Sequence, residues 1–314
     1  MRLVFIGTGE IGVPTLQSIF TARDHHLLAC LTQPDKPAGR RQELNASPIK
    51  ELALRHHVPI FQPVTIRDRA ALEQLRFMRP DVIVVMAYGQ ILPTEVLHIP
   101  RIACLNLHAS LLPRHRGAAP IHAAIEAGDR ETGITVMYMD EGLDSGDILL
   151  SKSLRIGRRE TSGTLHDRLA VLAPAPLHEA LALLKQGRAP RRPQNPAEVT
   201  YAPKLSREDG QIRWNSTHEE IDRRIRAMNP WPGAYTLLPT NDGPRTLKIF
   251  SCIQHTRAAG EPGRVLRADK NGILVAALKG GVLLRELQLE GKRRMPAGEF
   301  LLGNPLTTGA ILGA

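Results

Sequence analysis

The first half of the chain alternates short apolar runs with stretches in which apolar residues recur every three to four positions. The first pattern is typical of buried strands and the second of amphipathic helices. Strands that alternate with helices indicate a doubly wound α/β plan with a Rossmann-like, mostly parallel sheet. The predicted strands are 3–6, 27–31, 81–86, 102–107 and 134–139.

Prolines mark the limits of two helices in this half. Ser47 before Pro48 predicts a helix start, with serine as the cap and proline in the first turn, and this helix should end near residue 57. A second helical stretch starts at Thr164. Pro174 and Pro176 should kink or split it, because each proline removes a helical hydrogen bond and crowds the preceding turn.

A change of composition sets the last third of the chain apart. Prolines and arginines dominate residues 187–204, which we interpret as a basic linker. A short helix at 219–228 follows, and apolar runs at 247–252, 263–266, 273–277 and 282–289 are broken by glycine and proline, which predicts a small β-barrel. A chain of 314 residues exceeds the size at which one core stops growing. We therefore predict a first domain at 1–186 and a second at 205–314.

Composition points to an intracellular globular protein. Hydrophobic residues make up 42% of the chain, which is ordinary, and the three cysteines (Cys30, Cys104 and Cys252) have neither disulfide-framework nor zinc-ligand spacing. No apolar run approaches the roughly 20 residues that span a bilayer. The chain starts directly with a strand, which leaves no signal segment. We expect a cytoplasmic protein with no membrane partner and no metal.

The formal charge of +10 favours encounters with polyanions. Such a charge specifies neither a fold nor a sequence preference. For a basic protein taken by itself, the favoured explanation is that the basic residues are merely solvated surface.

Two polar side chains stand at the end of the strand predicted at 102–107. Asn106 and His108 are two residues apart and share one face of the strand. Turn-forming residues follow, and open α/β sheets bind ligands at such strand ends. Downstream, Gly142-Leu-Asp144-Ser-Gly146 offers a carboxylate. The alternative is that His108 is an ordinary histidine with a satisfied hydrogen bond.

A glycine-rich turn after the first strand offers a rival hypothesis. Gly7, Gly9 and Gly12 match the dinucleotide-binding fingerprint of dehydrogenases. The acid expected at the tip of the second strand is displaced, however, since Asp35 lies in a proline-containing loop. We interpret the glycines as turn and helix-packing residues.

The motifs around these residues resemble the folate-dependent formyltransferases. Similar segments extend into the last third, so the chain resembles most the longer branch of this family, which formylates methionyl-tRNA. Two departures concern loop geometry, since Gly9 replaces a common proline and Ala109 a common glycine. The matching segments are 32–40, 47–50, 87–93, 106–120, 142–146, 161–164, 200–202 and 229–232.

The resemblance implies transfer of the formyl group of 10-formyltetrahydrofolate to the α-amine of methionyl initiator tRNA. Asn106 and His108 would donate hydrogen bonds to the developing oxyanion. Asp144 would favour charged His108 and help to move the amine proton to the departing folate nitrogen. The resemblance selects this carboxylate over Asp140, Glu141 and Asp147. No covalent intermediate is required, and the acidic segment lacks the pattern of a calcium loop.

The resemblance also implies a folate pocket. Ser110 is read as structural, because the sequence offers it no activating base. Simple core packing is about equally plausible for Ile91 and Leu92. The implied folate-binding residues are Gly89, Ile91, Leu92, Ser110, Leu111, Leu112 and Pro113.

Basic residues in two segments are the implied tRNA contacts. The loop from Gln33 to Asn45 has no strand or helix signal and is long for a βα connection, as functional loops often are. Gln42 and Glu43 stand where the family often has lysines, which weakens the electrostatic attraction between this loop and tRNA. The second domain would be of OB type and hold the acceptor arm, and the protein would act as a monomer. The implied contacts are Lys36, Arg40, Arg41, Arg188, Arg191, Arg192 and Lys204.

Two other functions stay open at this point. A formyltransferase for a sugar nucleotide or another small amine would share the three polar residues but bind its acceptor without steep salt dependence. A non-enzymatic RNA-binding protein would show that salt dependence without turnover.

Overall fold

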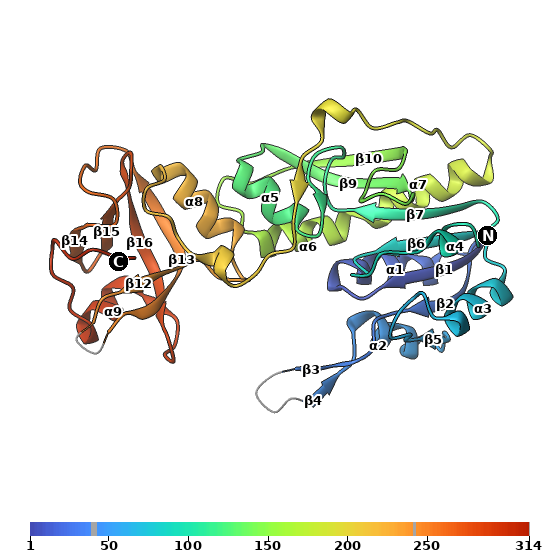
Figure 1. The fold of residues 1–314 in the computed structure, drawn as a ribbon, viewed down its shortest axis with the longest axis horizontal. Coiled ribbons are helices and arrows are strands. Elements are labelled where there is room, and N and C mark those ends of the chain that lie inside the picture. Colours follow the sequence, from blue (N-terminus) through green and yellow to red (C-terminus); the bar gives the residue numbers. More distant parts are fainter. Residues whose placement is uncertain (39–42, 241–242, 314) are drawn as a thin grey trace. The chain divides into compact units, whose positions relative to one another are not determined.

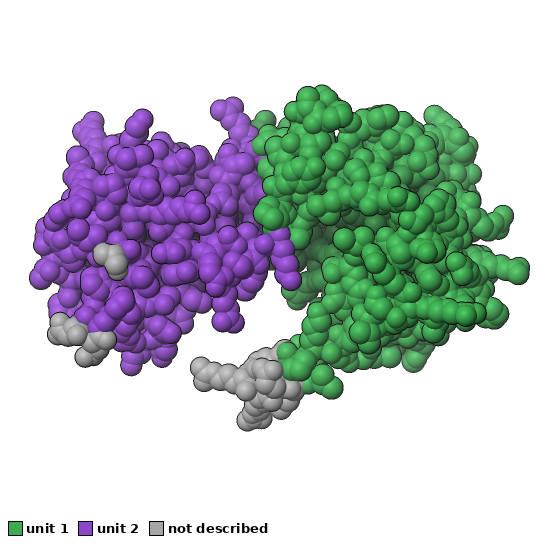
Figure 2. All heavy atoms as spheres, in the orientation of Figure 1, with its two compact units in different colours: residues 1–120, 131–155, 166–203 green, residues 121–130, 156–165, 204–314 purple. Residues whose placement is uncertain are grey.

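The computed structural model describes residues 1–38, 43–240 and 243–313 (Figure 1). The chain forms two compact units (Figure 2). Unit 1 comprises residues 1–120, 131–155 and 166–203, and unit 2 comprises residues 121–130, 156–165 and 204–314. Among the helices of the described residues, none has both the length and the apolar character to cross a membrane.

In the described residues, unit 1 is built on a seven-stranded sheet of order β10-β9-β7-β6-β1-β2-β5. The five strands from β7 to β5 are parallel, and β9 and β10 extend the sheet in antiparallel fashion. All five predicted strands are present. The strand at residues 148–155 escaped prediction because Ser151, Lys152 and Ser153 in its middle are exposed and polar. The strands are β1 (Arg2–Gly7), β2 (His26–Leu31), β5 (Ile60–Phe61), β6 (Val82–Met86), β7 (Ala103–His108), β9 (Glu131–Tyr138) and β10 (Ile148–Arg155).

The predicted helix signals of this half are confirmed. The Ser47 hydroxyl accepts a hydrogen bond of 3.2 Å from the Lys50 amide and so caps the helix that starts at Pro48. The long helical stretch is split at Ala173, immediately before Pro174. The helices are η1 (Glu10–Gly12), α1 (Val13–Thr21), α2 (Pro48–Arg55), α3 (Arg69–Met78), α4 (Thr94–Leu97), α5 (Pro120–Ala127), α6 (Ser162–Leu172), α7 (Pro174–Lys185) and η2 (Pro196–Glu198).

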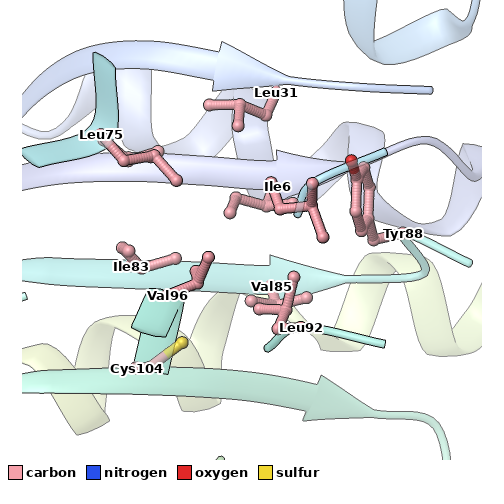
Figure 3. Packing of buried hydrophobic residues seen from close by; sticks show 11 residues of the cluster. Ile6, Leu31, Leu75, Ile83, Val85, Tyr88, Leu92, Val96 and Cys104 are labelled. Atoms are coloured by element: carbon pink, nitrogen blue, oxygen red, sulfur yellow. The ribbon is translucent and has the colours of Figure 1, made fainter. Parts of the chain in front are cut away.

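Alternate residues of β1 face opposite sides of the sheet. Ile6 belongs to a buried cluster with Leu75 of α3 and Val96 of α4 (Figure 3). Phe5 faces the other side, where its ring would lie 3.2 Å from a Cβ atom added to Gly12. Helices therefore cover both faces of the sheet, which confirms the doubly wound plan.

The glycines at the end of β1 and in the turn that follows it serve close packing. A Cβ atom at Gly7 would lie 2.6 Å from the Met86 carbonyl oxygen. The amides of Thr8 and Gly9 donate to the Ala87 carbonyl, at 3.2 and 3.1 Å. These amides are thus engaged by the chain itself, which agrees with turn and packing roles rather than with pyrophosphate binding.

Asp35 is likewise engaged within the protein. Its carboxylate accepts hydrogen bonds from Lys50 Nζ at 2.5 Å and from Gln62 Nε2 at 2.8 Å. These two bonds, that from Lys50 foremost, lower the pKa of the Asp35 carboxyl. The carboxylate therefore fixes its own loop instead of presenting itself to a ribose.

The loop predicted without strands contains two. β3 (Lys36–Ala38) pairs antiparallel with β4 (Glu43–Asn45). The prediction of an irregular loop was wrong, because strands of three residues, one of them including Pro37, are too short to show a periodic pattern.

Most of the predicted linker packs on unit 1, and we call residues 187–203 the strap. Arg192 and Ile148 exchange two backbone hydrogen bonds, of 2.8 and 3.1 Å. Further along, β11 (Tyr201–Ala202) pairs in parallel with β8 (Arg116–Gly117). The strap therefore runs along the same edge of unit 1 as the loops that follow β7 and β9.

Unit 2 contains a six-stranded antiparallel sheet in the part of the chain that the structure describes. The predicted strands and the predicted helix are present. Thr217 and Glu220 form a capping box at the start of α8. Besides most of α5, its elements are η3 (Glu208–Gly210), α8 (His218–Ala227), β12 (Tyr235–Leu238), β13 (Arg245–His255), β14 (Val265–Asp269), β15 (Gly272–Ala276), β16 (Gly281–Leu289), β17 (Met295–Pro296) and α9 (Ala297–Gly303).

Two truncations on α3 test the core of unit 1. Leu75 is fully buried, so Leu75→Ala should lower the free energy of unfolding by about 2–5 kcal/mol. Phe77 on the same helix is 88% exposed, so Phe77→Ala should change it by less than about 0.5 kcal/mol. Urea unfolding followed by circular dichroism measures both. Equal losses in the two variants would contradict this packing.

Candidate active site

The carboxyl end of β7 brings two polar side chains to one place. Asn106 and His108 alternate with the buried Leu105 and Leu107 along this strand. His108 is 5% exposed, whereas Asn106 is half-buried. The strand therefore fixes both side chains and leaves the amide accessible.

The Asp144 carboxylate joins them. Its Oδ1 accepts a hydrogen bond of 3.2 Å from Asn106 Nδ2, and its Oδ2 accepts one of 2.8 Å from the Gly117 amide. His108 Nδ1 lies 3.5 Å from the same Oδ2. An amide and an imidazole from β7 and a carboxylate from the turn at residues 142–146 thus converge in unit 1.

Glycines make the turn that carries Asp144. Asp144 itself has a φ of +49°, in the left-handed region. A Cβ atom at Gly142 would lie 2.0 Å from Ser145 Oγ, and one at Gly146 would lie 1.9 Å from the Tyr138 carbonyl oxygen. The tight turn therefore requires glycine at position 146, where the contact is with backbone, whereas at position 142 the Ser145 hydroxyl would have to move.

The other acids of this segment have other partners. Asp140 accepts hydrogen bonds from the Gly142 amide and the Ser145 hydroxyl, so it shapes the turn. Glu141 accepts a hydrogen bond from Thr94, and Asp147 pairs with Arg191. Their positions agree with the choice of Asp144 among the four acids.

The surroundings of His108 show which ring nitrogen carries a proton. Its Nε2 lies 2.9 Å from the His115 carbonyl oxygen, and because a carbonyl only accepts, Nε2 carries the proton. The Nδ1 atom then faces the Asp144 carboxylate, where it can take up or release a proton. Asn106 Nδ2 has two hydrogens, and the bond to Asp144 uses one of them.

The strap supplies two site residues that sequence reasoning missed. Gln194 Nε2 donates to the carbonyl oxygens of Asp144 and Gly146, both at 2.8 Å. Thr200 Oγ1 accepts a hydrogen bond of 2.8 Å from the His115 amide. Thr200 lies in a segment that resembles the family, which was a usable signal, whereas a glutamine between prolines and arginines carries none.

The predicted folate residues divide into two groups. Ser110 is fully buried and donates to the Arg114 carbonyl at 2.6 Å, which agrees with a structural role. Leu92 belongs to the core cluster, as Figure 3 shows, and Leu112 is also buried. By contrast, Ile91 is 71% exposed. Gly89 is exposed with a φ of +81°, and Leu111 and Pro113 are half-buried.

The predicted tRNA contacts also differ in their surroundings. Lys36 donates to Gln33 Oε1 at 2.6 Å. The Arg191 guanidinium lies 3.7 Å from the centre of the Tyr138 ring and 3.6 Å from Asp147. The other described members of the set are exposed, and Arg40 and Arg41 lie outside the described residues. These other members are Arg188, Arg192 and Lys204, and Lys36 and Arg191 are exposed as well.

The three cysteines are poorly suited to nucleophilic chemistry. Burial raises the pKa of Cys30 and that of Cys104 to about 12. Burial, together with the nearby Asp222 carboxylate, also raises the pKa of Cys252. Thiolate is the reactive form, so these side chains are inert at neutral pH. In the part of the chain that the structure describes, no three His, Cys, Asp or Glu side chains converge to hold a metal ion.

Two family models match the chain. One, described as formyl transferase, matches residues 1–181. The other, described as formyl transferase, C-terminal domain, matches residues 204–305.

A full-length relative and two solved structures resemble the chain. The methionyl-tRNA formyltransferase of Methylacidiphilum infernorum (isolate V4) is 49% identical over 314 residues, which is 100% of this chain and 98% of the relative. An N-formyltransferase from Helicobacter canadensis, solved with folinic acid and dTDP-3-aminofucose, gives a TM-score of 0.67 at 17% identity and covers 90% of this chain and 98% of its own. HypX from Aquifex aeolicus, solved with tetrahydrofolic acid, gives 0.62 at 19% identity and covers 100% of this chain and 51% of its own.

The raised thiol pKa values predict slow alkylation. At pH 8.5, iodoacetamide should modify Cys30 and Cys104 about three orders of magnitude more slowly in the native protein than in guanidinium, because a higher pKa leaves less thiolate. Mass spectrometry of timed samples measures the rates, and the denatured protein is the control. Native rates within tenfold of the denatured rates would contradict the assignment of these thiols as inert.

Proposed function

The chain belongs to the formyl transferase family, and we propose that it transfers the formyl group of 10-formyltetrahydrofolate to the α-amine of methionyl initiator tRNA. The observation that carries this function is 49% identity, over its whole length, to a methionyl-tRNA formyltransferase. The product would be the formylmethionyl-tRNA that initiates translation. We further propose that Asn106, His108 and Asp144 are the catalytic residues.

The reaction requires stabilisation of a negative charge. When the amine attacks the formyl carbon, charge develops on the formyl oxygen. The second hydrogen of Asn106 Nδ2 can donate to this oxygen while the first holds Asp144. A proton on His108 Nδ1 would be shared between this oxygen and Asp144 Oδ2, which lies 3.5 Å from Nδ1.

The reaction also requires movement of one proton. The attacking amine must lose it, and the folate nitrogen must gain it as the carbon–nitrogen bond breaks. Asp144 Oδ2 and His108 Nδ1 lie 3.5 Å apart and can accept and return this proton as a pair. The step needs no covalent enzyme intermediate.

The folate would bind beside the carboxyl ends of β6 and β7. Ile91 is exposed there, and Gly89 leaves backbone accessible, so these residues can contact the pterin directly. Leu92, Leu112 and Ser110 would support the pocket from beneath because they are buried. Leu111 and Pro113 complete the set of folate-binding residues that we propose. HypX, which has a similar fold, has been solved in complex with tetrahydrofolic acid.

The tRNA would contact basic residues of the strap and of unit 2. We propose residues 1–186 as the catalytic domain, 187–204 as the basic connection and 205–314 as the tRNA-binding domain of OB type. Arg188, Arg192 and Lys204 are exposed and can neutralise phosphates. Arg191 is a weaker candidate because Asp147 and the Tyr138 ring hold it. Lys36 remains in the proposed set, as do Arg40 and Arg41.

We also propose that the protein acts as a monomer in the cytoplasm. Translation initiation takes place there, and free thiols agree with a reducing compartment. Light scattering after size exclusion would test the monomer directly.

Formylation of methionyl initiator tRNA tests the function and the catalytic residues together. Asp144→Asn should lower kcat by about 10²- to 10⁴-fold, because it removes the proton acceptor. Asn106→Ala should lower kcat by about 10²- to 10³-fold, because it removes an oxyanion donor. The affinity for tRNA should stay within about twofold of the wild type, since both groups serve the transition state. Formylmethionine released by mild deacylation measures the product.

The matched control is Asp167→Asn, because the Asp167 side chain is 81% exposed. It should keep wild-type turnover. Full activity of Asn106→Ala or Asp144→Asn would refute the site assignment. A wild-type protein that formylates a sugar nucleotide or another small amine, and not methionyl-tRNA, would refute the function.

Salt dependence tests the strap as a tRNA contact. If Arg192 neutralises a phosphate, Arg192→Ala should weaken tRNA binding and reduce the slope of log K against log[salt] by about 1. Arg69→Ala removes the same charge from α3, where the side chain is 92% exposed, and serves as the control. Filter binding or fluorescence anisotropy measures the slopes. Identical slopes for Arg192→Ala and the wild type would exclude this contact.

A further inference from the structure

A glutamine of the strap is built into the turn that carries the Asp144 carboxylate. Gln194 is 9% exposed, although it stands between exposed neighbours, Pro193 and Asn195. A buried amide is costly unless its donors and acceptors have partners. Its hydrogen bonds therefore indicate what the side chain holds in place.

The Gln194 amide uses each of its hydrogen-bonding positions. Nε2 donates to the carbonyl oxygens of Asp144 and Gly146, both at 2.8 Å. Oε1 accepts from Arg116 Nε at 3.1 Å and from Arg116 Nη2 at 2.8 Å. Two donors and two acceptor positions are the full capacity of such an amide. The fit orients the side chain in one way only, with nitrogen toward the turn and oxygen toward the guanidinium.

These bonds hold the carboxylate from two sides. On one side, Gln194 fixes the backbone of a turn in which Asp144 has a φ of +49°. On the other, Gln194 fixes the Arg116 side chain, and the next residue, Gly117, donates its amide to Asp144 Oδ2 at 2.8 Å. The Gln194 amide thus contributes, together with the bonds from Asn106 and Gly117, to the direction of the carboxylate relative to His108 Nδ1.

The structure assigns Gln194 as a positioning residue for Asp144, an inference that rests on the proposed formyl transfer. Its hydrogen bonds reach backbone carbonyl groups of the turn and the Arg116 side chain, so it acts through the turn and through Arg116. It lies within residues 182–203, between the segments that the two family models match. A segment that connects two domains therefore also completes the catalytic centre of the first.

An isosteric variant tests this assignment. Gln194→Met keeps the volume of the side chain and removes the amide. We expect kcat for formylation of methionyl-tRNA to fall by about 10- to 100-fold, because displacements of about 1 Å cost up to about 10²-fold in rate. KM for 10-formyltetrahydrofolate and for methionyl-tRNA should change by less than about twofold. A residue that only stabilised the fold would change the melting temperature without this loss of kcat per folded molecule.

Gln186→Met is the matched control, because Gln186 is an exposed glutamine just before the strap. It should keep the wild-type kcat and melting temperature. If Gln194→Met does not fold, Gln194→Glu replaces it. The glutamate keeps the acceptor for Arg116 but has no hydrogen for the two carbonyl groups, so we expect the same loss of kcat.

A double-mutant cycle with Arg116→Met tests whether Gln194 acts through Arg116. Because both side chains act in one network, the double variant should lose about as much kcat as the more damaging single variant, rather than the product of the two losses. Independent, multiplicative losses would overturn the assignment. So would a folded Gln194→Met enzyme with kcat within twofold of wild type, or one whose defect lies in KM alone. An inactive wild-type enzyme would instead refute the proposed function.

Discussion

The carboxylate of Asp144 is the centre on which the rest of this site depends. It accepts a hydrogen bond from Asn106 on β7 and another from the Gly117 amide on β8, and it faces His108. A half-buried carboxylate needs such donors, because leaving it unpaired would be costly. The strands, the glycine turn and the strap can each be understood by the way in which they keep these donors around one charge.

Backbone shape matters here as much as side-chain chemistry. The turn at Asp144 requires glycine at position 146, because an added Cβ atom would collide with the Tyr138 carbonyl oxygen. Gly117 has the same constraint, since a Cβ atom there would lie 2.6 Å from the Ala202 carbonyl oxygen. The small residues of the motifs thus allow close approach of segments that are distant in sequence.

Much of this arrangement follows from local patterns. Buried strands and proline-marked helix starts are local signals, and the spacing of Asn106 and His108 placed them on one face of a strand. Selection of Asp144 among four nearby acids needed the family resemblance, because spacing alone did not distinguish them. Gln194 could not be predicted: its role depends on where a proline-rich segment packs, and that is a tertiary property. The short β3 and β4 strands were missed for lack of length.

The packing of the strap also decides where this protein can be recombined. Composition suggests an exchange point near residue 187, but a chimera joined there would receive its glutamine and Thr200 from the donor of the C-terminal module. A junction after Pro203 keeps the strap, with the hydrogen bonds that its residues make, together with the catalytic unit of the same protein. The segment that must be transferred as a whole to keep the catalytic site intact is therefore longer than the domain that composition defines. It extends to the end of the strap.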